Sequence, residues 1–494
     1  MARVIIIGSG FGGSVAAKRF AEAGWDVTVL EMGERWTDPA KLQQSQDTKY
    51  ILRMFCDYPA DYMFARPKCV VVTGTGWGGG SLVYSKIHLR AKPAAFQAGW
   101  PAGYTGANLA PFYSRVETRL DIKPHTDVFK YKRSQVFAQG CCAAGLGAPE
   151  ANALADTGCQ KCGWCVPICK FGKKNTMAKT YLADAEATGR VTPMTNCRVK
   201  CITRDPVSGY RVVYWKTDGV THNYHTVNSG SLYYVTGDKV VIAAGAMESP
   251  CILKRSLVDQ GWGASFPPLY GFSGSSGIGS GIDGNGDFAV GGFVPQTTDA
   301  YKGTIMAASV HGPDWMIEDL WGIPAGPSVK FNSSFYVSDA NRGAGTHTWG
   351  IGYKQRLKDY PSKMLAMVLV GKSPSGGNMS VTDNNGLVQL SNTAYQPHAW
   401  SYQKAREVVT ALGGQLGNTP WEKDGQSVTA HPTGGNAMGT VVQPTNLQVY
   451  GNAGVHVIDA SVVPHTFVNP VHTIMAVAEK AMDVILGVPG APTW

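Results

Sequence analysis

The chain contains few charged residues and no long apolar run. Only 16% of its 494 residues are Asp, Glu, Lys or Arg, and no stretch approaches the ~20 consecutive apolar residues of a membrane-spanning helix. Lys and Arg outnumber Asp and Glu by 44 to 35, which gives a formal net charge of +9, but they form no basic run. The sequence also lacks an internal repeat and a heptad pattern. We therefore expect no nucleic-acid partner, no integral membrane segment and no repeat architecture.

Glycine, in contrast, is abundant, with 60 residues, and hydrophobic residues make up 44% of the chain. A length of 494 residues is enough for two or more domains, each with its own core. The first strand-like run begins at Val4, which leaves no room for a signal peptide ahead of it. We therefore expect a globular, cytoplasmic protein with glycine-rich loops.

Residues 4–33, VIIIGSGFGGSVAAKRFAEAGWDVTVLEMG, carry a nucleotide-binding pattern. The pattern predicts a buried strand, a glycine turn, an amphipathic helix and a second strand that ends in the acid Glu31. Gly8, Gly10 and Gly13 have the G-x-G-x-x-G spacing, which permits a tight turn, close approach to a diphosphate and contact between helix and strand. The Glu31 carboxylate is placed to accept hydrogen bonds from ribose hydroxyls. The segment therefore predicts a dinucleotide site of the Rossmann type.

Residues 70–91, VVVTGTGWGGGSLVYSKIHLRA, form a second glycine-rich segment between two apolar runs. Such a segment lets extended backbone lie along a long cofactor, which FAD needs and a nicotinamide dehydrogenase seldom does. Residues 192–202 and 239–250 predict further strands, the latter followed by a glycine turn and a helix. Together these patterns favour FAD as the cofactor.

The stretch from 256 to 430 has a different composition. Residues 272–292 are rich in glycine and serine, but interleaved Ile, Phe and Val favour an ordered loop near a ligand over a linker. The alternating runs at 333–339 and 346–354 predict strands of an antiparallel sheet. This part of the chain is therefore predicted to be a separate structural unit.

The C-terminal segment 455–486 returns to a strand, followed by a helix that begins at Pro470. The fold class is therefore α/β, with a discontinuous nucleotide domain. Residues 1–255 and 431–494 are predicted to form that domain, with inserted segments that contribute to the substrate side. Residues 256–430 are predicted to form a substrate domain, an antiparallel sheet with covering helices.

In chain order the sequence carries GSGFGGSVAAKRFAEAG…VLEMGERW, GTGWGGGSLV, KTYLADAEATGRVT…NCRVKCI, VVIAAGAMESP, HPTGGNAMG and VHVIDASVVP…VNPVHTIMAVAEKA. Together these motifs resemble the glucose–methanol–choline (GMC) family of FAD-dependent oxidoreductases, and within it the branch of bacterial cholesterol (3β-hydroxysteroid) oxidases. The resemblance spans the whole chain. It implies a Rossmann-like FAD domain of the glutathione-reductase type combined with a substrate domain.

The resemblance also implies positions for the site residues. His431 in HPTGG falls where the sterol oxidases have the histidine that contacts the substrate hydroxyl, and Asn469 in VNP falls where they have an asparagine beside the flavin. Histidine suits removal of a hydroxyl proton, because its ordinary pKa lies near neutrality. The residues expected to contact FAD are Gly8, Gly10, Phe11, Gly12, Gly13, Glu31, Met32, Gly74, Gly76, Gly79, Gly80, Ser81, Val199, Ala244, Gly245, Asp459, Ala460, Asn469 and Pro470.

The function that the resemblance implies is oxidation of an alcohol by hydride transfer to flavin N5. The expected substrate is a bulky or steroid-like secondary alcohol, and the second partner is O2 or another electron acceptor. A sugar or glycoside substrate is the alternative within the family. Ser81, Leu82 and Val83 stand where some members have the histidine that bonds FAD covalently, so we expect dissociable FAD.

Sterol oxidases also use a glutamate for double-bond isomerisation, in a segment that ends in PAG. The comparable stretch here is WMIEDLWGIPAG, residues 315–326, in which Glu318 or Asp319 can fill that role with a register slip of one residue. The alternative is an exposed acidic pair with no catalytic role.

A cysteine loop departs from the family pattern. Cys159, Cys162, Cys165 and Cys169 have the C-x2-C-x2-C-x3-C spacing of a bacterial ferredoxin run. No proline follows the last cysteine, and in two-cluster ferredoxins the fourth cysteine serves a second cluster, for which no second run exists here. We therefore expect no metal, and instead a thiol-rich structural loop, or disulfides in an oxidising compartment. The alternative is an electron-transfer flavoprotein module with an iron–sulfur loop at 159–169.

Overall fold

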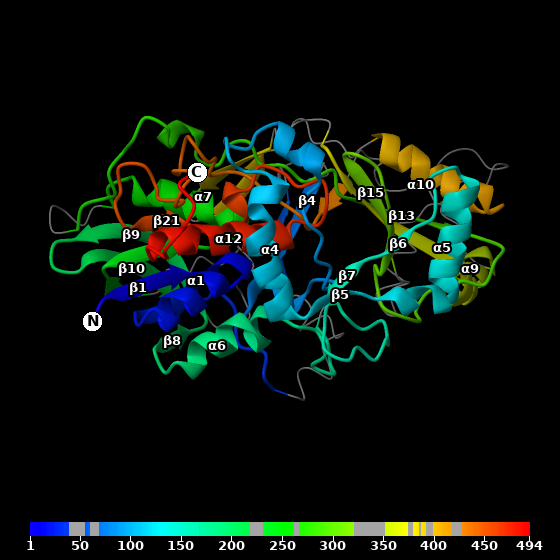
Figure 1. Cartoon of the computed structure of the whole chain (residues 1–494), viewed down its shortest axis with the longest axis horizontal. Helices are drawn as coiled ribbons and strands as arrows, with labels where there is room; N and C mark the ends of the chain where they lie inside the picture. Colours follow the sequence, from blue (N-terminus) through cyan, green and yellow to red (C-terminus); the bar gives the residue numbers. More distant parts are fainter. Residues whose placement is uncertain are drawn as a thin grey trace.

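Two sheets, each with its own helices, lie at opposite ends of the molecule (Figure 1). One is a five-stranded sheet and the other a six-stranded sheet. The computed structural model describes residues 1–38, 55–59, 69–166, 168–217, 231–260, 266–320, 351–373, 379–384, 387–391, 399–416 and 427–494. No helix within these ranges is long and apolar enough to cross a bilayer.

The five-stranded sheet is parallel and is built from apolar strands, because it is buried in the larger core of the molecule. Val4 on its central strand pairs with Val27 on one side and Lys239 on the other. In spatial order the strands are β21 (Val455–Val457), β12 (Lys239–Ile242), β1 (Arg3–Ile7), β2 (Asp26–Leu30) and β8 (Val191–Met194). Both ends of the chain therefore contribute to one sheet, as a discontinuous α/β fold requires.

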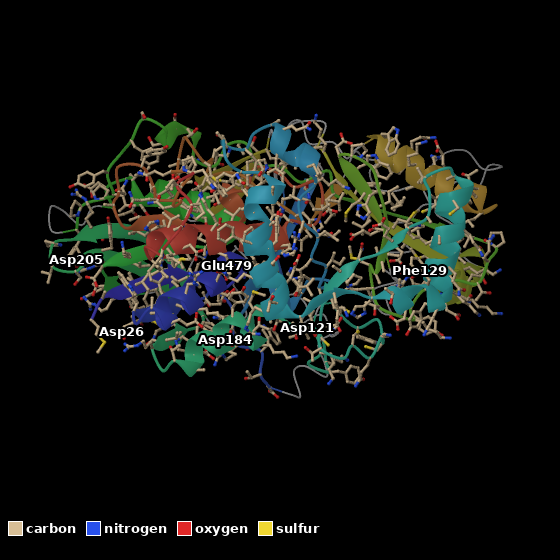
Figure 2. All side chains as sticks on the ribbon, in the orientation of Figure 1. Asp26, Asp121, Phe129, Asp184, Asp205 and Glu479 are labelled. Atoms are coloured by element: carbon tan, nitrogen blue, oxygen red, sulfur yellow. The ribbon has the colours of Figure 1, made fainter. Side chains whose placement is uncertain are left out.

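The helices that pack together beside this sheet are α1 (Phe11–Glu22), α4 (Gly106–Leu120), α6 (Tyr181–Ala187) and α12 (Val471–Ile485). Glu479 of α12 stands where they meet (Figure 2). Its carboxylate pairs with Arg19 of α1 at 2.5 Å and Arg115 of α4 at 2.9 Å. Tyr181 of α6 donates a hydrogen bond to it at 3.2 Å. This cluster ties the first helix of the chain to the last.

The turn between β1 and α1 and the first turn of α1 each contain a position that accepts only glycine. Gly8 has a φ of +97°, and a Cβ there would lie 2.3 Å from the carbonyl oxygen of Ala243, which follows β12. A Cβ on Gly12 would lie 1.9 Å from the carbonyl oxygen of Ile458, which follows β21. Both distances are well inside van der Waals contact, so the turn packs directly against the neighbouring strand ends.

Smaller sheets bring distant loops beside the parallel sheet. A three-stranded antiparallel sheet contains β9 (Cys197–Asp205), β10 (Gly209–Lys216) and β11 (Leu232–Gly237), and α7 (Gly245–Ser256) packs on β9. A second contains β20 (Ser427–Thr429), β4 (Cys69–Gly74) and β3 (Phe55–Pro59), with β20 parallel to β4. Two-stranded sheets are formed by β17 (Ser380–Asn384) with β18 (Leu387–Ser391) and by β5 (Ile122–Pro124) with β7 (Ala153–Ala155). The pairing of β20 with β4 brings His431 toward the second glycine-rich segment.

The six-stranded sheet is antiparallel throughout. Its strands in order are β19 (Gln415–Leu416), β13 (Phe288–Phe293), β16 (Met364–Gly371), β15 (Trp315–Leu320), β14 (Ala308–His311) and β6 (Glu150–Ala151). Helices α5 (Lys132–Ala143) and α10 (Ala399–Ala411) pack on it, and α9 (Ile351–Lys363) precedes β16. Helix α5 and strand β6 thus come from the first half of the chain. The predicted domains, with their boundaries at 255 and 431 and their inserted segments, stay a prediction.

One predicted strand is wrong in its described part. Residues 351–354, the end of the alternating run at 346–354, form the first turn of α9, which continues to Lys363. A short alternating run does not distinguish a strand from the start of a helix. Residues 346–350 and the predicted strand at 333–339 lie outside the described residues.

The last helix begins one residue later than predicted. Pro470 is its N-cap, and Val471 is its first residue. The glycine–serine tract at 272–292 is described throughout and leads into β13.

Candidate active site

A cavity of about 930 Å³ is lined by the first glycine turn, the second glycine segment, the start of α7 and the start of α12. Motifs from both ends of the chain therefore meet in one place. The predicted site residues that line it are Gly8, Gly10, Phe11, Gly12, Glu31, Met32, Gly74, Gly79, Gly80, Val199, Ala244, Gly245, His431, Asp459, Ala460, Asn469 and Pro470.

Three predicted cofactor residues lie behind this wall. A Cβ on Gly13 would lie 2.0 Å from the carbonyl oxygen of Gly8, so Gly13 permits contact between α1 and the turn. The backbone nitrogen of Gly76 donates to Oε1 of Glu31 at 3.2 Å. The hydroxyl of Ser81 donates to the carbonyl of Gly78 at 2.6 Å and accepts from the backbone nitrogen of Met177 at 2.9 Å. These residues shape the cavity from outside its lining.

The Glu31 carboxylate holds three loops together. Its Oε2 accepts hydrogen bonds from the backbone nitrogen of Ser9 at 3.0 Å and from the Ser9 hydroxyl at 2.6 Å. Its Oε1 accepts from the backbone nitrogens of Gly33 at 3.0 Å and Gly76 at 3.2 Å. A carboxylate has about four lone-pair sites, so a ribose hydroxyl must share or displace one of these donors. The ribose contact stays a prediction, beside a structural role that the sequence did not indicate.

Asp459 joins the start of α7 to the following short helix in the same manner. Its Oδ2 accepts hydrogen bonds from the Gly245 nitrogen at 2.8 Å and the Ser249 hydroxyl at 2.5 Å. Its Oδ1 accepts from the nitrogen and the hydroxyl of Ser461, at 2.8 and 2.5 Å. Burial raises the pKa of this carboxyl, and the four hydrogen bonds oppose the rise. Asp459 therefore lines the cavity and also holds the neighbouring segments of its wall in place.

The helices that begin at the cavity without a cap from the N-cap side chain include α1 after Gly10 and α12 after Pro470. Their first backbone N–H groups and the positive ends of their dipoles favour negative charge, such as a diphosphate or an electron-rich ring edge. A Cβ on Gly10 would meet nothing within 4 Å, so backbone there is open to a ligand. Within the described part of the chain, the buried Oδ1 of Asn469 has no hydrogen-bond partner. These features fit an elongated dinucleotide such as FAD.

His431 lies between two polar side chains. Its Nδ1 is 3.1 Å from Oδ2 of Asp287, an electrostatic contact that lacks the alignment of a hydrogen bond. Its Nε2 is 3.3 Å from Nδ2 of Asn469. Oδ2 of Asp287 also accepts from the backbone nitrogen of Ala430 at 2.8 Å, which fixes the carboxylate. The carboxylate favours a proton on Nδ1, so Nε2 is the nitrogen available as a base.

Glu318 and Asp319 face opposite sides of β15, because side chains alternate along a strand. Oε2 of Glu318 accepts from Nδ2 of Asn469 at 3.4 Å, and Oε1 accepts from Nδ2 of Asn152 at 3.3 Å. Burial raises the pKa of Glu318 well above its ordinary range. Asp319 instead accepts hydrogen bonds from Ser134 of α5 at 2.5 Å and from the Ala308 nitrogen at 3.0 Å. Both side chains are 0% exposed, so the alternative of an exposed acidic pair is wrong.

The wall that the six-stranded sheet contributes to the cavity is apolar, with Phe288, Ala289 and Val368 beside Asp287. The sequence patterns did not identify these residues or Asp287 as part of the site. Asp287 lies within the glycine-rich tract, directly before β13, and its contact with His431 depends on the packing of β13 near β20. The expectation of an ordered loop at 272–292 near a ligand was the only indication of it.

The four cysteines of the loop line a second, small cavity beside this one. Every cysteine whose side chain the structure describes is a free thiol, which is against the disulfide alternative for this loop. In the same described ranges, no group of three or more His, Cys, Asp or Glu side chains is spaced to hold one metal ion.

Comparison with known proteins gives consistent matches. Family models described as GMC oxidoreductase match residues 2–265 and 389–478. A cholesterol oxidase of Mycobacterium tuberculosis is 26% identical, over 97% of this chain and 90% of its own length. A long-chain-alcohol oxidase of Arabidopsis thaliana is 25% identical, over 51% of this chain and 34% of its own length. The crystal structure of pyridoxine 4-oxidase from Mesorbium loti has a TM-score of 0.66 at 17% identity and covers 98% of this chain and 99% of its own, a likeness of fold alone.

Proposed function

Because the chain belongs to the GMC oxidoreductase family and is an oxidoreductase acting on CH–OH groups, we propose that it binds FAD and oxidises a bulky apolar alcohol. The observation that carries this proposal is the position of His431 and Asn469. Both line the same cavity as the dinucleotide-type glycine turn. An acid–base group and a cofactor cradle thus share one cavity.

The residues that would hold FAD divide by position. The uncapped start of α1 suits the diphosphate, Val199 lines the cavity where the resemblance expects the adenine, and the start of α12 suits the flavin. FAD supplies a hydride acceptor when it is bound.

The chain's own residues supply the proton chemistry. Nε2 of His431 would accept the hydroxyl proton of the substrate, while the hydride leaves the carbon that bears this hydroxyl for the FAD that the cavity would hold. Asp287 holds the ring and stabilises the imidazolium that forms, and Nδ2 of Asn469 lies 3.3 Å from Nε2, where it can donate to the substrate oxygen. The positive end of α12 favours the negative charge that arrives at this end of the cavity.

The cavity wall supports an apolar alcohol over a sugar. Phe288, Ala289, Met306 and Val368 offer no hydrogen-bonding side chain, whereas a sugar pocket needs several. The two named relatives that oxidise alcohols act, by name, on cholesterol and on long-chain alcohols.

We also assign to Glu318, and not Asp319, the place of a base for double-bond isomerisation. Glu318 lies behind Asn469 and contacts it, whereas Asp319 is bonded to α5 and the Ala308 backbone. Its raised pKa favours the protonated form, so it would act as a base only after it loses this proton to solvent.

The test is a single-turnover experiment without oxygen, in which bleaching of the flavin absorption measures its reduction. The substrates are a panel of apolar alcohols that includes a 3β-hydroxysteroid. We expect His431→Ala and Asn469→Ala to retain FAD and to slow bleaching, by roughly 10²–10⁴-fold where an acid–base group is lost. His465→Ala, a histidine outside the cavity lining, is the control and should bleach at the parent rate. Parent rates in both site variants would refute the proposed roles.

A further inference from the structure

The cysteine loop lies against the proposed active site. We propose that Cys159, Cys162, Cys165 and Cys169 hold an iron–sulfur cluster, which takes electrons from the alcohol-oxidising site and passes them singly to an external acceptor. The cluster stands on the geometry of the loop alone, and its role as a relay rests on the proposed function.

The first observation is that all four cysteines line one cavity. A fourth cysteine that serves a different cluster would point elsewhere, but Cys169 faces the same space as the other three. The geometry thereby removes one of the two sequence arguments against a cluster.

The second observation is the charge around this cavity. Lys86 and Lys174 line it and are both buried, at 1% and 2% exposure. Lys86 pairs with Asp156. The ammonium of Lys174 donates to the carbonyls of Leu82 at 2.6 Å, Tyr84 at 2.9 Å and Cys165 at 2.8 Å, all of them neutral.

A buried ammonium held only by neutral groups is costly unless negative charge lies nearby. Four thiolates around an iron–sulfur core carry net negative charge and would compensate Lys174. The backbone nitrogen of Lys161 also donates to the sulfur of Cys159 at 3.3 Å, the kind of contact that tunes a cluster potential. Neutral thiols would leave Lys174 without such a counter-charge.

The third observation is that the two cavities share a wall. Val166, next to Cys165, lines the large cavity, as do Ser85 and Ile87 on either side of Lys86. Residues that are adjacent in the chain therefore line the two cavities, which places the cysteines next to the proposed flavin site. Cys159, Cys162 and Cys169 are partly exposed, so the far side of the cluster would be open to a partner.

Oxidation of CH–OH to C=O releases two electrons and two protons. The protons go to solvent, and a cluster that carries one electron at a time transfers twice for each alcohol. Two equivalents of a one-electron acceptor, such as a haem protein or ferricenium, are then reduced.

The experiment begins with holoprotein purified without oxygen and reconstituted with iron and sulfide. We expect iron and acid-labile sulfide in equal amounts, about four of each per chain for a cubane on four cysteines, and an EPR signal after reduction with dithionite. Zinc as the only bound metal, iron without sulfide, or a protein without metal would each overturn the proposal.

Variants separate the loop from adventitious iron. Cys162→Ser and Cys165→Ser should lose the EPR signal and most of the sulfide, whereas Cys142→Ser, an exposed cysteine outside the loop, should retain both. Bound FAD and circular dichroism report whether each variant is folded. If the loop variants do not fold, the iron, sulfide and EPR signal of the parent protein still decide. Sulfide retained in folded loop variants would overturn the assignment.

The relay is tested by adding the alcohol panel to the anaerobic protein. We expect the EPR signal of the reduced cluster to appear after the flavin bleaches, and ferricenium to be reduced at least tenfold more slowly in folded Cys165→Ser than in Cys142→Ser. Bleaching with no cluster signal would overturn the relay. A flavin that no alcohol bleaches, in protein that contains the cluster, would refute the proposed function and leave the cluster site in place.

Discussion

His431 is held by two side chains that come from separate parts of the chain. Asn469 follows it on the C-terminal segment, and Asp287 comes from the end of the glycine tract that leads into β13. The resemblance predicted His431 and Asn469, because each of them lies in a short local motif. Asp287 has no local pattern, since its place at the site depends on how β13 packs beside β20.

Asp287→Asn tests the role of this carboxylate. Asn removes the charge but can still accept the hydrogen bond from the Ala430 nitrogen. We expect anaerobic flavin reduction to slow, by less than the roughly 10²–10⁴-fold that accompanies loss of an acid–base group. Since Asp287 acts through His431, its effect should vanish in the His431→Ala background, as a double-mutant cycle measures. Effects that multiply in the double variant would contradict this account.

The sequence could not decide whether Glu318 or Asp319 lies at the site, and the two faces of strand β15 separate them. The resemblance gave a register uncertain by one residue, and a shift of one residue along a strand exchanges its two faces. Glu318 turns toward Asn469, and Asp319 turns toward Ser134 and Arg133 on α5.

The raised pKa of Glu318 predicts a pH-dependent stability. Its carboxyl binds a proton more tightly in the folded state, so folding loses stability as the pH rises above the unfolded value of about 4.3, by about 1.4 kcal/mol per pH unit up to the folded pKa. Glu318→Gln removes this loss. The melting temperature of the variant minus that of the parent should therefore increase from about pH 5 to about pH 8.

Asp319→Asn is the control for that experiment. It weakens a buried pair with Arg133 and should lower the melting temperature at both pH values. A Glu318→Gln difference that is the same at both pH values would show that the carboxyl does not titrate between them.

At the scale of elements, the strand–turn–helix units were predictable because each is continuous in sequence. In each unit an apolar run forms the strand, and a glycine or proline turn precedes the helix. The units are β1 with α1, β12 with α7 and β21 with α12. The pairing of β20 with β4 and the entry of β6 into the six-stranded sheet were not predictable, since both join segments that are remote in the chain. Local sequence preferences predict each strand–turn–helix unit, whereas long-range packing determines which strands pair with it.

Two glycines of the first turn separate packing from cofactor contact. Gly12→Ala places a Cβ 1.9 Å from the carbonyl of Ile458 and should destabilise the fold by several kcal/mol, about the cost of overpacking or more. Gly10→Ala meets nothing within 4 Å but projects at the cavity, so it should fold and bind FAD more weakly. Gly271→Ala, which also meets nothing within 4 Å and lies outside the cavity lining, is the control. Thermal unfolding and FAD titration distinguish them, and equal stability of the Gly12 and Gly10 variants would contradict the close packing.

At the scale of the whole molecule, the cavity wall joins the two ends of the chain. The first turn and the start of α12 face the same space, and Glu479 ties α12 to Arg19 and Arg115 behind it. A ligand that contacts both ends must therefore stabilise the closed, discontinuous domain as a unit, because the unfolded chain offers it no assembled site.

FAD should consequently raise the unfolding temperature of the whole protein. Because Ser81, Leu82 and Val83 offer no histidine for covalent attachment, acid should release the flavin into the supernatant and leave apoprotein for comparison. Free FAD at one hundred times its Kd adds about 2.7 kcal/mol to the free energy of unfolding, and flavin fluorescence should rise at the temperature at which circular dichroism is lost. NAD at the same concentration is the control and should leave the apoprotein transition where it is, since NAD has no isoalloxazine to place at the start of α12 and beside His431. Flavin that stays with the acid precipitate would show covalent attachment, and an equal shift with NAD would mean that the cavity recognises only the adenosine diphosphate half that both molecules share.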